Sequence, residues 1–309
     1  MSKKYAFDWE GLKDNIKKEE TQKKKVFEKD TRFWRHTADD AGKAAAIIRF
    51  IPDKEGNPFV KFYSHSFEYM VDGQKKYWIR NCINTFGYDK ECPVCKKNME
   101  YWNSAFEQDK KLASQRKRKL NYISNILVVK NPANPEDEGK VFLYQYGQKI
   151  FDKMKQLMFP TDEDLLDDDF KSFVPFDLDE GAEFLLKVKK QGDFPNYDDS
   201  KFSSQKSLGN SKEVDRIMDM TYGLDEFMAA DKFPSNEDTI KALGVVLGLE
   251  IPKSMKEQVE DEPDDLDMEE VTPSVDNIFD DLEEKKDEKS KQKDDDDDDF
   301  DLDDWDDFK

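Results

Sequence analysis

The chain has 309 residues, of which 36% are hydrophobic and 39% are charged. That balance is too polar for a wholly globular protein, so we expect part of the chain to be disordered. No run of 18 apolar residues and no apolar leader is present, and we therefore expect neither a membrane span nor a secretory signal. Three cysteines cannot form an even disulfide framework, which favours a reducing, cytosolic protein.

The net charge of −21 is concentrated at one end of the chain. Residues 256–309 hold 27 acidic residues and seven lysines, so the first 255 residues carry only −1. Within that part, residues 1–35 carry +4 and residues 161–180 carry −8. The remaining body is slightly basic, and the acidic total does not argue against a polyanionic partner.

The first segment, residues 1–35, is predicted to be a basic N-terminal arm. Residues 5–29 are rich in lysine, have few apolar side chains and contain no proline, which favours a helix that cannot form a core. Two interpretations stay open here. The arm is either a solvated helix or a docking segment for another protein or subunit.

Residues 36–252 are predicted to form a β-rich α+β core. Six short runs of β-branched and aromatic residues predict strands at residues 44–52, 58–71, 75–83, 121–129, 140–147 and 182–190. The turn Asp72-Gly73 predicts a hairpin between the second and third runs. Helical periodicity is found in residues 93–111, 148–158, 211–228 and 237–249. A small barrel carrying inserted helices is the expected architecture.

Residues 253–309 are predicted to be a disordered acidic tail, because they cannot bury enough apolar area to offset chain entropy. One interpretation is that such a tail serves for solubility alone. Its end, however, spaces apolar side chains among the acids, a pattern that suits a peptide docking into basic, apolar pockets. These candidate partner-binding residues are Phe300, Leu302, Trp305 and Phe308.

One constellation indicates a metal site. All three cysteines fall within 14 positions, as Cys82, Cys92 and Cys95, and His65 lies 17 positions before Cys82. Tetrahedral zinc takes four nitrogen or sulfur ligands, and three Cys with one His complete the set. We predict one structural Zn²⁺, because four protein ligands leave no open coordination position.

Two other interpretations of the cysteines stay open. A redox Cys-x-x-Cys would leave Cys82 unexplained and would favour a thioredoxin-like βαβ pattern, which is missing from the sequence. Buried free thiols are the other alternative. His36, in the basic arm, has no companion at ligand spacing and is expected to be a surface histidine.

Basic and aromatic residues alternate through the core. Lysine and arginine follow a phosphate backbone, while flat rings offer unstacked bases a surface, and together they favour single strands. For any single ring a place in the core is the better interpretation; for the set, a stacking cleft is. The candidates are Arg116, Lys117, Arg118, Lys119, Tyr122, Lys140, Tyr144, Tyr146, Lys149, Phe194 and Tyr197.

Signatures of catalysis are missing: the sequence has no phosphate-binding loop, dinucleotide fingerprint or nucleophile elbow. We therefore do not expect the protein to be an enzyme. Two alternative functions stay open. A metal-dependent nuclease would need an open metal position, and a zinc-containing scaffold would bind proteins and leave the basic runs as solvated surface.

Several stretches together resemble the single-stranded DNA-binding, helix-destabilising proteins of T-even-type bacteriophages. They cover much of the chain between Ala44 and Phe202, in order, and the acidic tail agrees in character. The stretches that carry the resemblance are residues 46–50, the Cys/His constellation, and residues 125–130, 138–142, 149–153 and 194–202.

The resemblance implies an OB-fold barrel core with an inserted structural zinc subdomain. It implies His65, Cys82, Cys92 and Cys95 as ligands. It also implies a DNA cleft that includes Arg49, Tyr122, Tyr144, Phe194 and Tyr197, with Tyr88 shifted by one position in its loop.

The function implied is cooperative coating of single-stranded DNA in viral replication, recombination and repair, in the cytoplasm of an infected bacterial host. The arm would contact a neighbouring protomer, and the tail would bind replication and recombination proteins and compete with DNA for the cleft. Two departures from the family pattern are seen. The basic triplets near Lys3 and at Arg116 lack the following hydroxyl residue, and Ile123 stands where the family has Trp.

Overall fold

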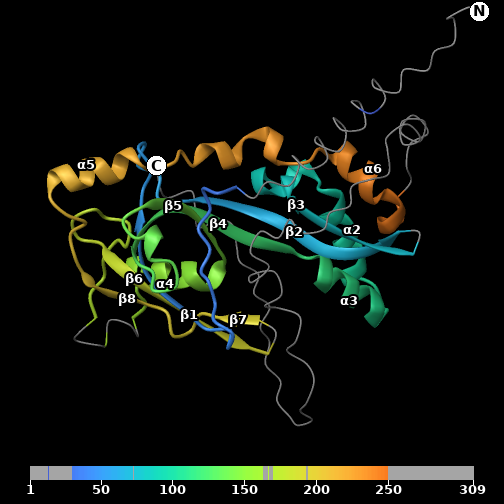
Figure 1. Cartoon of the computed structure of the whole chain (residues 1–309). Coiled ribbons are helices and arrows are strands. Elements are labelled where there is room, and N and C mark those ends of the chain that lie inside the picture. Colours follow the sequence, from blue (N-terminus) through green and yellow to red (C-terminus); the bar gives the residue numbers. More distant parts are fainter. Residues whose placement is uncertain are drawn as a thin grey trace, which may run out of the picture.

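An antiparallel sheet of eight strands dominates the protein (Figure 1). The computed structural model describes Lys13 and residues 30–249 apart from 72, 163–165, 167–169 and 193. Strand order is β3-β2-β4-β1-β6-β7, with β5 also paired to β4 and β8 to β6. The strands are β1 (Ala44–Ile51), β2 (Val60–Val71), β3 (Gln74–Asn81), β4 (Arg118–Lys130), β5 (Val141–Tyr146), β6 (Ala182–Gln191), β7 (Phe194–Asn196) and β8 (Lys201–Gln205).

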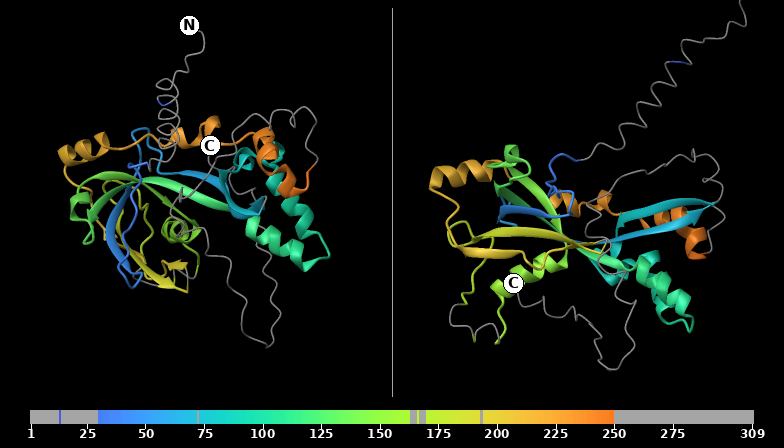
Figure 2. Two further views of the ribbon diagram at one scale, coloured as in Figure 1. Left: turned by 45° about the vertical axis from the view of Figure 1, so that its right-hand side comes forward. Right: turned by 60° about the horizontal axis from the view of Figure 1, so that its bottom comes forward.

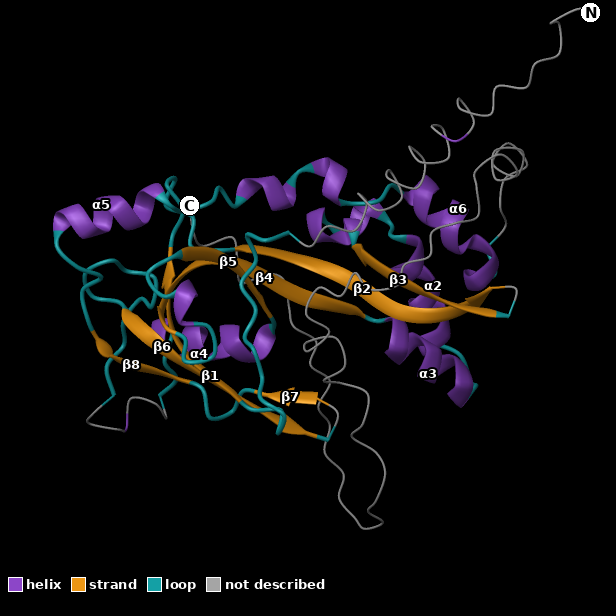
Figure 3. Cartoon of the chain, in the orientation of Figure 1, coloured by secondary structure: helices purple, strands orange, loops and turns teal. Residues whose placement is uncertain are grey.

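The helices lie around this sheet, as Figure 3 shows by colour. Within the described residues the α-helices are α2 (Pro93–Trp102), α3 (Glu107–Arg116), α4 (Gln148–Met158), α5 (Ser211–Asp219) and α6 (Asn236–Leu247). Short 3₁₀ turns are η1 (Ile83–Phe86), η2 (Tyr88–Lys90), η3 (Pro135–Asp137), η5 (Asp225–Met228) and η6 (Ala230–Lys232). No helix in these parts of the chain is both long and apolar enough to cross a bilayer.

The β-rich prediction is confirmed, because each of the six expected strands is present. The predicted hairpin pairs Val71 with Gln74, and Gly73 has the positive φ of 78° that this turn requires. Strand β4 begins at Arg118, so the basic run leads directly into the sheet. Strands β7 and β8 were not predicted, because they have only three and five residues, too few to show an alternating pattern.

Two helix predictions were wrong in extent. Residues 93–111 do not form one helix, because α2 ends at Trp102 and the Ser104 hydroxyl then donates to the Asp109 carboxylate and accepts from the Phe106 N–H. The helix predicted at 211–228 ends at Asp219, and the 3₁₀ turn η5 begins only at Asp225. Local polar bonds of this kind compete with helix continuation.

The long strands β2 and β4 join two lobes (Figure 2). One lobe, which we call the body, encloses a buried cluster around Phe50, Tyr146 and Phe184. The other, the Cys/His lobe, comprises β3, η1, η2, α2, α3 and the adjoining end of β2, and α6 packs on it. Its cluster combines Phe67 and Trp78 with Leu243 and Leu247 from α6.

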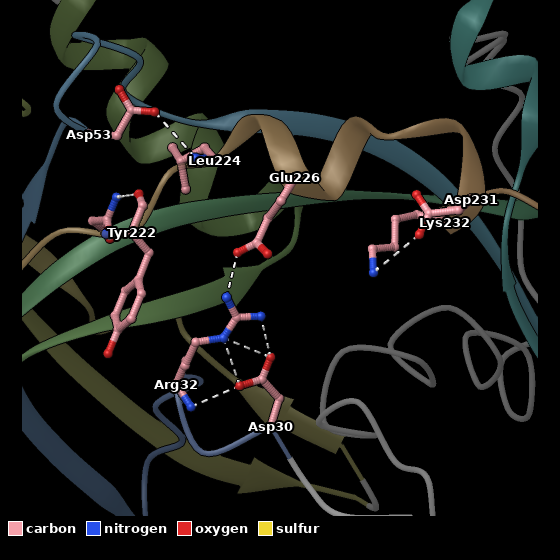
Figure 4. A network of polar contacts seen from close by, with 9 residues as sticks. Asp30, Arg32, Asp53, Tyr222, Leu224, Glu226, Asp231 and Lys232 are labelled. Atoms are coloured by element: carbon pink, nitrogen blue, oxygen red, sulfur yellow. Dashed lines mark hydrogen bonds and ion pairs between the residues drawn. The ribbon is translucent and has the colours of Figure 1, made fainter. Parts of the chain in front are cut away.

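A segment that we call the strap, residues 220–235, crosses one face of β2 and β4. Leu224 and Phe233 of the strap are buried there with Phe62 and Ile123. Polar contacts fix the strap in register (Figure 4): the Asp53 carboxylate accepts from the Leu224 N–H at 3.2 Å. The Asn125 side chain accepts from the Tyr222 N–H at 2.9 Å and donates to its carbonyl at 2.9 Å.

The last residues of the predicted arm, from Asp30 on, are held against the body. The Trp34 N–H donates to the Leu143 carbonyl and the Leu143 N–H donates to the Arg32 carbonyl, both at 2.8 Å. The Arg32 guanidinium pairs with both Asp30 and Glu226, joining this segment to the strap (Figure 4). Residues 32–34 therefore extend the sheet edge at β5.

Candidate metal centre and nucleic-acid surface

Three consecutive elements bring the four candidate metal ligands together. His65 lies on β2, Cys82 directly follows β3, and Cys92 and Cys95 stand at the beginning of α2. The strand pairing sets the first contact, because the Cys82 N–H donates to the Tyr63 carbonyl at 2.7 Å. The four side chains form a cluster whose ligand atoms lie within 4.8 Å of one another.

The distances fit tetrahedral zinc. The His65 Nε2 atom lies 3.4 Å from the Cys95 sulfur and 3.6 Å from the Cys92 sulfur, and the Cys82 and Cys95 sulfurs are 3.6 Å apart. Zinc bonds of about 2.3 Å to sulfur and about 2.0 Å to nitrogen place tetrahedral ligands about 3.5–3.8 Å apart. The donor set and the spacing are those of a closed structural site.

Neighbouring groups orient these ligands. The His65 Nδ1 atom is 2.8 Å from the Arg116 carbonyl, which leaves Nε2 facing the sulfurs. The Cys92 N–H donates to the Asn84 side chain at 2.8 Å. Cys92 and Cys95 also lie at a helix N-terminus, where the helix dipole favours thiolates.

Hydrogen bonds within the cluster couple the protonation of its four groups. Burial by itself lowers the pKa of His65, but hydrogen bonds to the Cys82 and Cys92 sulfurs outweigh it and raise the pKa to about 9. Hydrogen bonds from Cys82 and Cys95 lower the pKa of Cys92, whereas hydrogen bonds with Cys82 and Cys92 raise the pKa of Cys95. A divalent cation would hold the thiols deprotonated.

A second feature is the face of β2 and β4 opposite the strap. The register pairs Lys61 with Tyr122, Tyr63 with Leu120 and His65 with Arg118, so these side chains share one face. The Arg118 guanidinium lies over the Tyr63 ring, 4.0 Å from its centroid. Partial burial lowers the pKa of Lys61. We call Lys61, Tyr63, Arg118 and Tyr122 the β2–β4 face; it runs from the Cys/His lobe into the body.

Four tyrosines predicted to stack on bases lie in the core of the body, and only Tyr122 among them belongs to the β2–β4 face. Tyr122, Tyr144, Tyr146 and Tyr197 belong to the cluster at the centre of the body and are at most 4% exposed. The Tyr122 ring is covered by Phe151 of α4, at 4.1 Å and 10° between planes. Its hydroxyl donates to Gln148 at 3.1 Å. Taken singly, each of these rings occupies the core position expected for a single aromatic residue. Contact of the set with DNA stays a prediction.

Two predicted arginines are also buried. Arg49, 2% exposed, donates to the Asp177 carbonyl at 2.5 Å. Arg116 lies over the Phe67 ring at 5.4 Å, and its carbonyl orients His65. Both arginines contribute to packing in this structure.

The other predicted residues are spread more widely. Lys140 and Lys149 are exposed, and Lys117 and Lys119 are half-buried. Lys119 pairs with Ser64, so it lies on the face of the strap, opposite Arg118. Tyr88 and Phe194 have described backbones but no described side chains, and Phe300, Leu302, Trp305 and Phe308 lie outside the described residues.

Sequence reasoning missed Lys61 and Tyr63. They belong to the strand predicted at residues 58–71, and their alternation with Phe62 was a signal that they face away from the strap side. The pairing of β2 with β4 was needed to place them beside Arg118. Ile123, by contrast, lies on the strap side, where it is buried with Leu224.

Known proteins resemble this chain over most of the described residues. Residues 42–247 match the family described as gp32 DNA binding protein like. The single-stranded DNA-binding protein of Enterobacteria phage T4 is 38% identical over 220 residues, 70% of each chain. The corresponding protein of Enterobacteria phage T2 is 37% identical over the same share. The chain belongs to the gp32-like family.

The region matched by the gp32-like family contains both features described above. It includes the four Cys/His ligands and the whole β2–β4 face, together with the strap and α6. Residues 1–41 and 248–309 lie outside the matched range. Membership in the gp32-like family therefore concerns the body and the Cys/His lobe.

Proposed function

We propose that this protein binds single-stranded DNA with little sequence preference, coats it cooperatively and destabilises duplexes during viral replication, recombination and repair. Membership in the gp32-like family supports binding to DNA. The observation that carries the proposal is the β2–β4 face, where Arg118 lies over Tyr63 beside Lys61 and Tyr122.

The chemistry of this face suits an unpaired strand. Lys61 and Arg118 would neutralise phosphates and release counterions, which makes the affinity depend on salt. Tyr63 would stack on a base at about 1–3 kcal/mol. Tyr122 would do the same once the Phe151 ring moves away from it. Bases of a duplex are already stacked, so the protein would bind single strands more tightly. Binding would therefore lower the melting temperature of the duplex.

Zinc would be held by His65, Cys82, Cys92 and Cys95, and it would supply folding energy, not catalysis. A closed four-ligand site offers no position for a substrate, which counts against a nuclease. The His65–Arg116 hydrogen bond joins the site to the end of α3, from which the chain passes directly into Arg118. Metal binding would thereby fix the position of the cationic half of the β2–β4 face.

We also assign the body to the OB-fold class, with the Cys/His lobe as its insertion. A strongly curved antiparallel sheet around one buried cluster, with β4 pairing to β2, β1 and β5, supports this assignment. OB-folds commonly bind single strands on a sheet face. The remaining predicted contacts, from Lys140, Lys149, Tyr144, Tyr197 and Phe194, would extend the path of the strand across the body.

Three further proposals concern the ends of the chain and its location. Residues 1–35, at +4, would contact a neighbouring protomer on the same strand, which would produce cooperativity. Residues 253–309 would bind replication and recombination proteins and would compete with DNA for the cationic surface. The site of action would be the cytoplasm of an infected bacterium.

Titration of the full-length protein with matched single- and double-stranded oligonucleotides, at two salt concentrations, tests the proposed function. We expect tighter binding to the single strand and a steep loss of affinity at the higher salt. Equal affinity for both forms, or an affinity independent of salt, would contradict the proposal and favour a scaffold that binds proteins.

A further inference from the structure

A small pocket opens on the strap side of the sheet, away from the β2–β4 face. It lies where the edge strand β3 meets the strap and has a volume of about 210 Å³. That is smaller than the roughly 300–1,000 Å³ of sites for complete small-molecule ligands, and it suits one large side chain. The lining residues are Phe62, Ile79, Arg80, Asn81, Phe227 and Lys232.

The lining combines an apolar base with cations at the rim. Phe62, Ile79 and Phe227 supply the apolar surface, while Arg80 is exposed on β3 and Lys232 on the strap. Lys232 pairs with its neighbour Asp231 at 3.7 Å, and both side chains are largely exposed (Figure 4). Exposed pairs of this length are weak, so an approaching carboxylate can replace this one.

The chain itself contains a segment of matching chemistry. Residues 294–309 hold eleven aspartates and one lysine, and among them stand Phe300, Leu302, Trp305 and Phe308. An aromatic side chain flanked by carboxylates complements an apolar pocket with a cationic rim. The other undescribed end, residues 1–29, carries nine lysines against six acids, and the same cations would repel it.

The last described residue before the tail, Leu249, lies close to the pocket. Leu249 packs against the cluster that contains Trp78, and the Arg80 guanidinium lies 5.7 Å from the centre of the Trp78 ring. Fifty residues lie between Leu249 and Phe300. A polar chain of that length has a mean reach of roughly 40 Å, more than such neighbouring points require.

We infer that the pocket between β3 and the strap binds the aromatic, acidic end of this protein's own C-terminal segment, with Trp305 or Phe300 inserted between Phe62 and Phe227. This contact is distinct from competition between the acidic run and DNA, because the pocket faces away from Lys61, Tyr63 and Tyr122. It would keep the end of the tail on the Cys/His lobe until a partner protein with a similar pocket captures it. The inference does not depend on DNA binding.

Photo-crosslinking in the full-length chain tests this inference. A benzophenone amino acid at position 305 should crosslink within one chain to peptides that contain residues 79–81 or 227–232. The same group at position 279, in the middle of the acidic segment, should give few such crosslinks. Saturating single-stranded DNA should leave the crosslinks from position 305 in place.

Charge reversal provides the matched comparison. Arg80→Glu with Lys232→Glu should lower the crosslink yield by about fivefold or more, since both rim cations become acids. Lys212→Glu with Lys241→Glu, on α5 and α6, makes the same change of charge away from the pocket and should leave the yield as it was. Asp301→Asn with Asp303→Asn and Asp304→Asn, which leaves the core untouched, should also reduce it.

Other outcomes would overturn the inference. Crosslinks to residues 116–124, or their loss on adding DNA, would mean that the tail occupies the DNA surface instead. Crosslinks found only between chains would mean that a second copy provides the occupant. Crosslinks that survive both the core and the tail charge changes would show that the pocket chemistry does not recognise the tail.

Discussion

At the scale of single residues, the Cys/His cluster is assembled by both local spacing and long-range strand pairing. Cys92 and Cys95 meet because one helical turn separates them, whereas His65 reaches them only because β2 pairs with β3 and positions Cys82. The ligand atoms of the four side chains are thereby held within 4.8 Å of one another. A metal ion bound there would add its binding free energy to the free energy of folding.

Replacing one ligand should therefore destabilise the protein strongly. Cys92→Ser should bind less than one zinc per chain and lower the melting temperature by about 10 °C or more. Metal analysis and thermal unfolding measure both effects. Wild-type protein treated with a chelator provides the control and should melt like the variant. A variant that keeps one zinc and melts like wild type would show that Cys92 is not a ligand.

Asp53 is a second residue whose effect on stability can be tested. Burial raises its pKa, but hydrogen bonds from the Asn57, Leu224 and Glu55 N–H groups lower it more, and the net pKa lies below 3.8. A carboxyl group whose pKa is lowered by folding stabilises the fold fully at pH values above its ordinary pKa. This contribution is lost as the pH falls through the lowered pKa. Asp53→Asn should thus cost about 1–3 kcal/mol at pH 7.

The difference between Asp53→Asn and wild type should narrow as pH falls below about 4, which urea unfolding at several pH values can measure. Asp219→Asn is the matched control, because Asp219 is exposed and pairs only with Lys54 at 3.3 Å among the described contacts. A difference that stays constant down to pH 3 would mean that the Asp53 charge does not hold the strap.

At the scale of elements, the strand pair β2–β4 separates two roles by alternation. Phe62 and Ile123 face the strap and are buried with Leu224, while Tyr63 and Tyr122 face the other way. The strap side is closed by packing, and the β2–β4 face keeps Arg118 over Tyr63 at its edge. The proposed function is assigned to this second face.

Substitutions on this face should have distinguishable effects. Tyr63→Ala should weaken single-strand binding by about 1–3 kcal/mol with the salt slope unchanged. Arg118→Ala should lower the salt slope by about 0.7, the value for one phosphate contact with a single strand. Fluorescence titrations over a range of salt measure both quantities.

Controls for these substitutions lie on neighbouring strands. Tyr77→Ala removes an exposed tyrosine from β3, and we expect wild-type affinity. Lys119→Ala removes a charge from the same basic run but from the strap side, and its effect should be smaller than that of Arg118→Ala. Equal effects of all four variants would mean that the β2–β4 face has no special role.

Much of this arrangement could be predicted from the sequence, and the remainder depends on pairing. Six strands, the hairpin at Gly73 and the grouping of His65 with the three cysteines follow from residue type and spacing alone. The break between α2 and α3 does not, because it depends on a side-chain bond from Ser104. Nor does the burial of Tyr122, which is covered by Phe151 from an element 29 positions further along the chain. Lys61 and Tyr63 were missed because their neighbour Arg118 comes from a distant strand.

At the scale of the whole molecule, two lobes share the strands β2 and β4, and the strap joins them on the far side (Figure 2). The Cys/His lobe and the body therefore present one connected surface on the β2–β4 face. Residues 30–34 are bound to both the sheet edge and the strap, so the arm leaves the core from a fixed point. Such an anchored exit is suited to contact with a neighbouring protomer.

Deleting residues 1–29 should separate cooperativity from intrinsic binding. We expect unchanged affinity for an oligonucleotide that holds one protein and loss of clustering on long strands. Binding curves on short and long single strands, with full-length protein as the control, measure the two effects. Equal cooperativity with and without the arm would reject the assignment of the arm to protomer contacts.

The central claim, that a single strand follows the β2–β4 face, is tested most directly by photo-crosslinking with oligonucleotides that carry iododeoxyuridine, followed by mass spectrometry of the crosslinked peptides. The account predicts crosslinks in residues 59–65 and 118–124, with further sites in residues 142–151, and their loss in Tyr63→Ala with Arg118→Ala. Crosslinks confined to the strap or to α5, on the opposite side of the sheet, would contradict it.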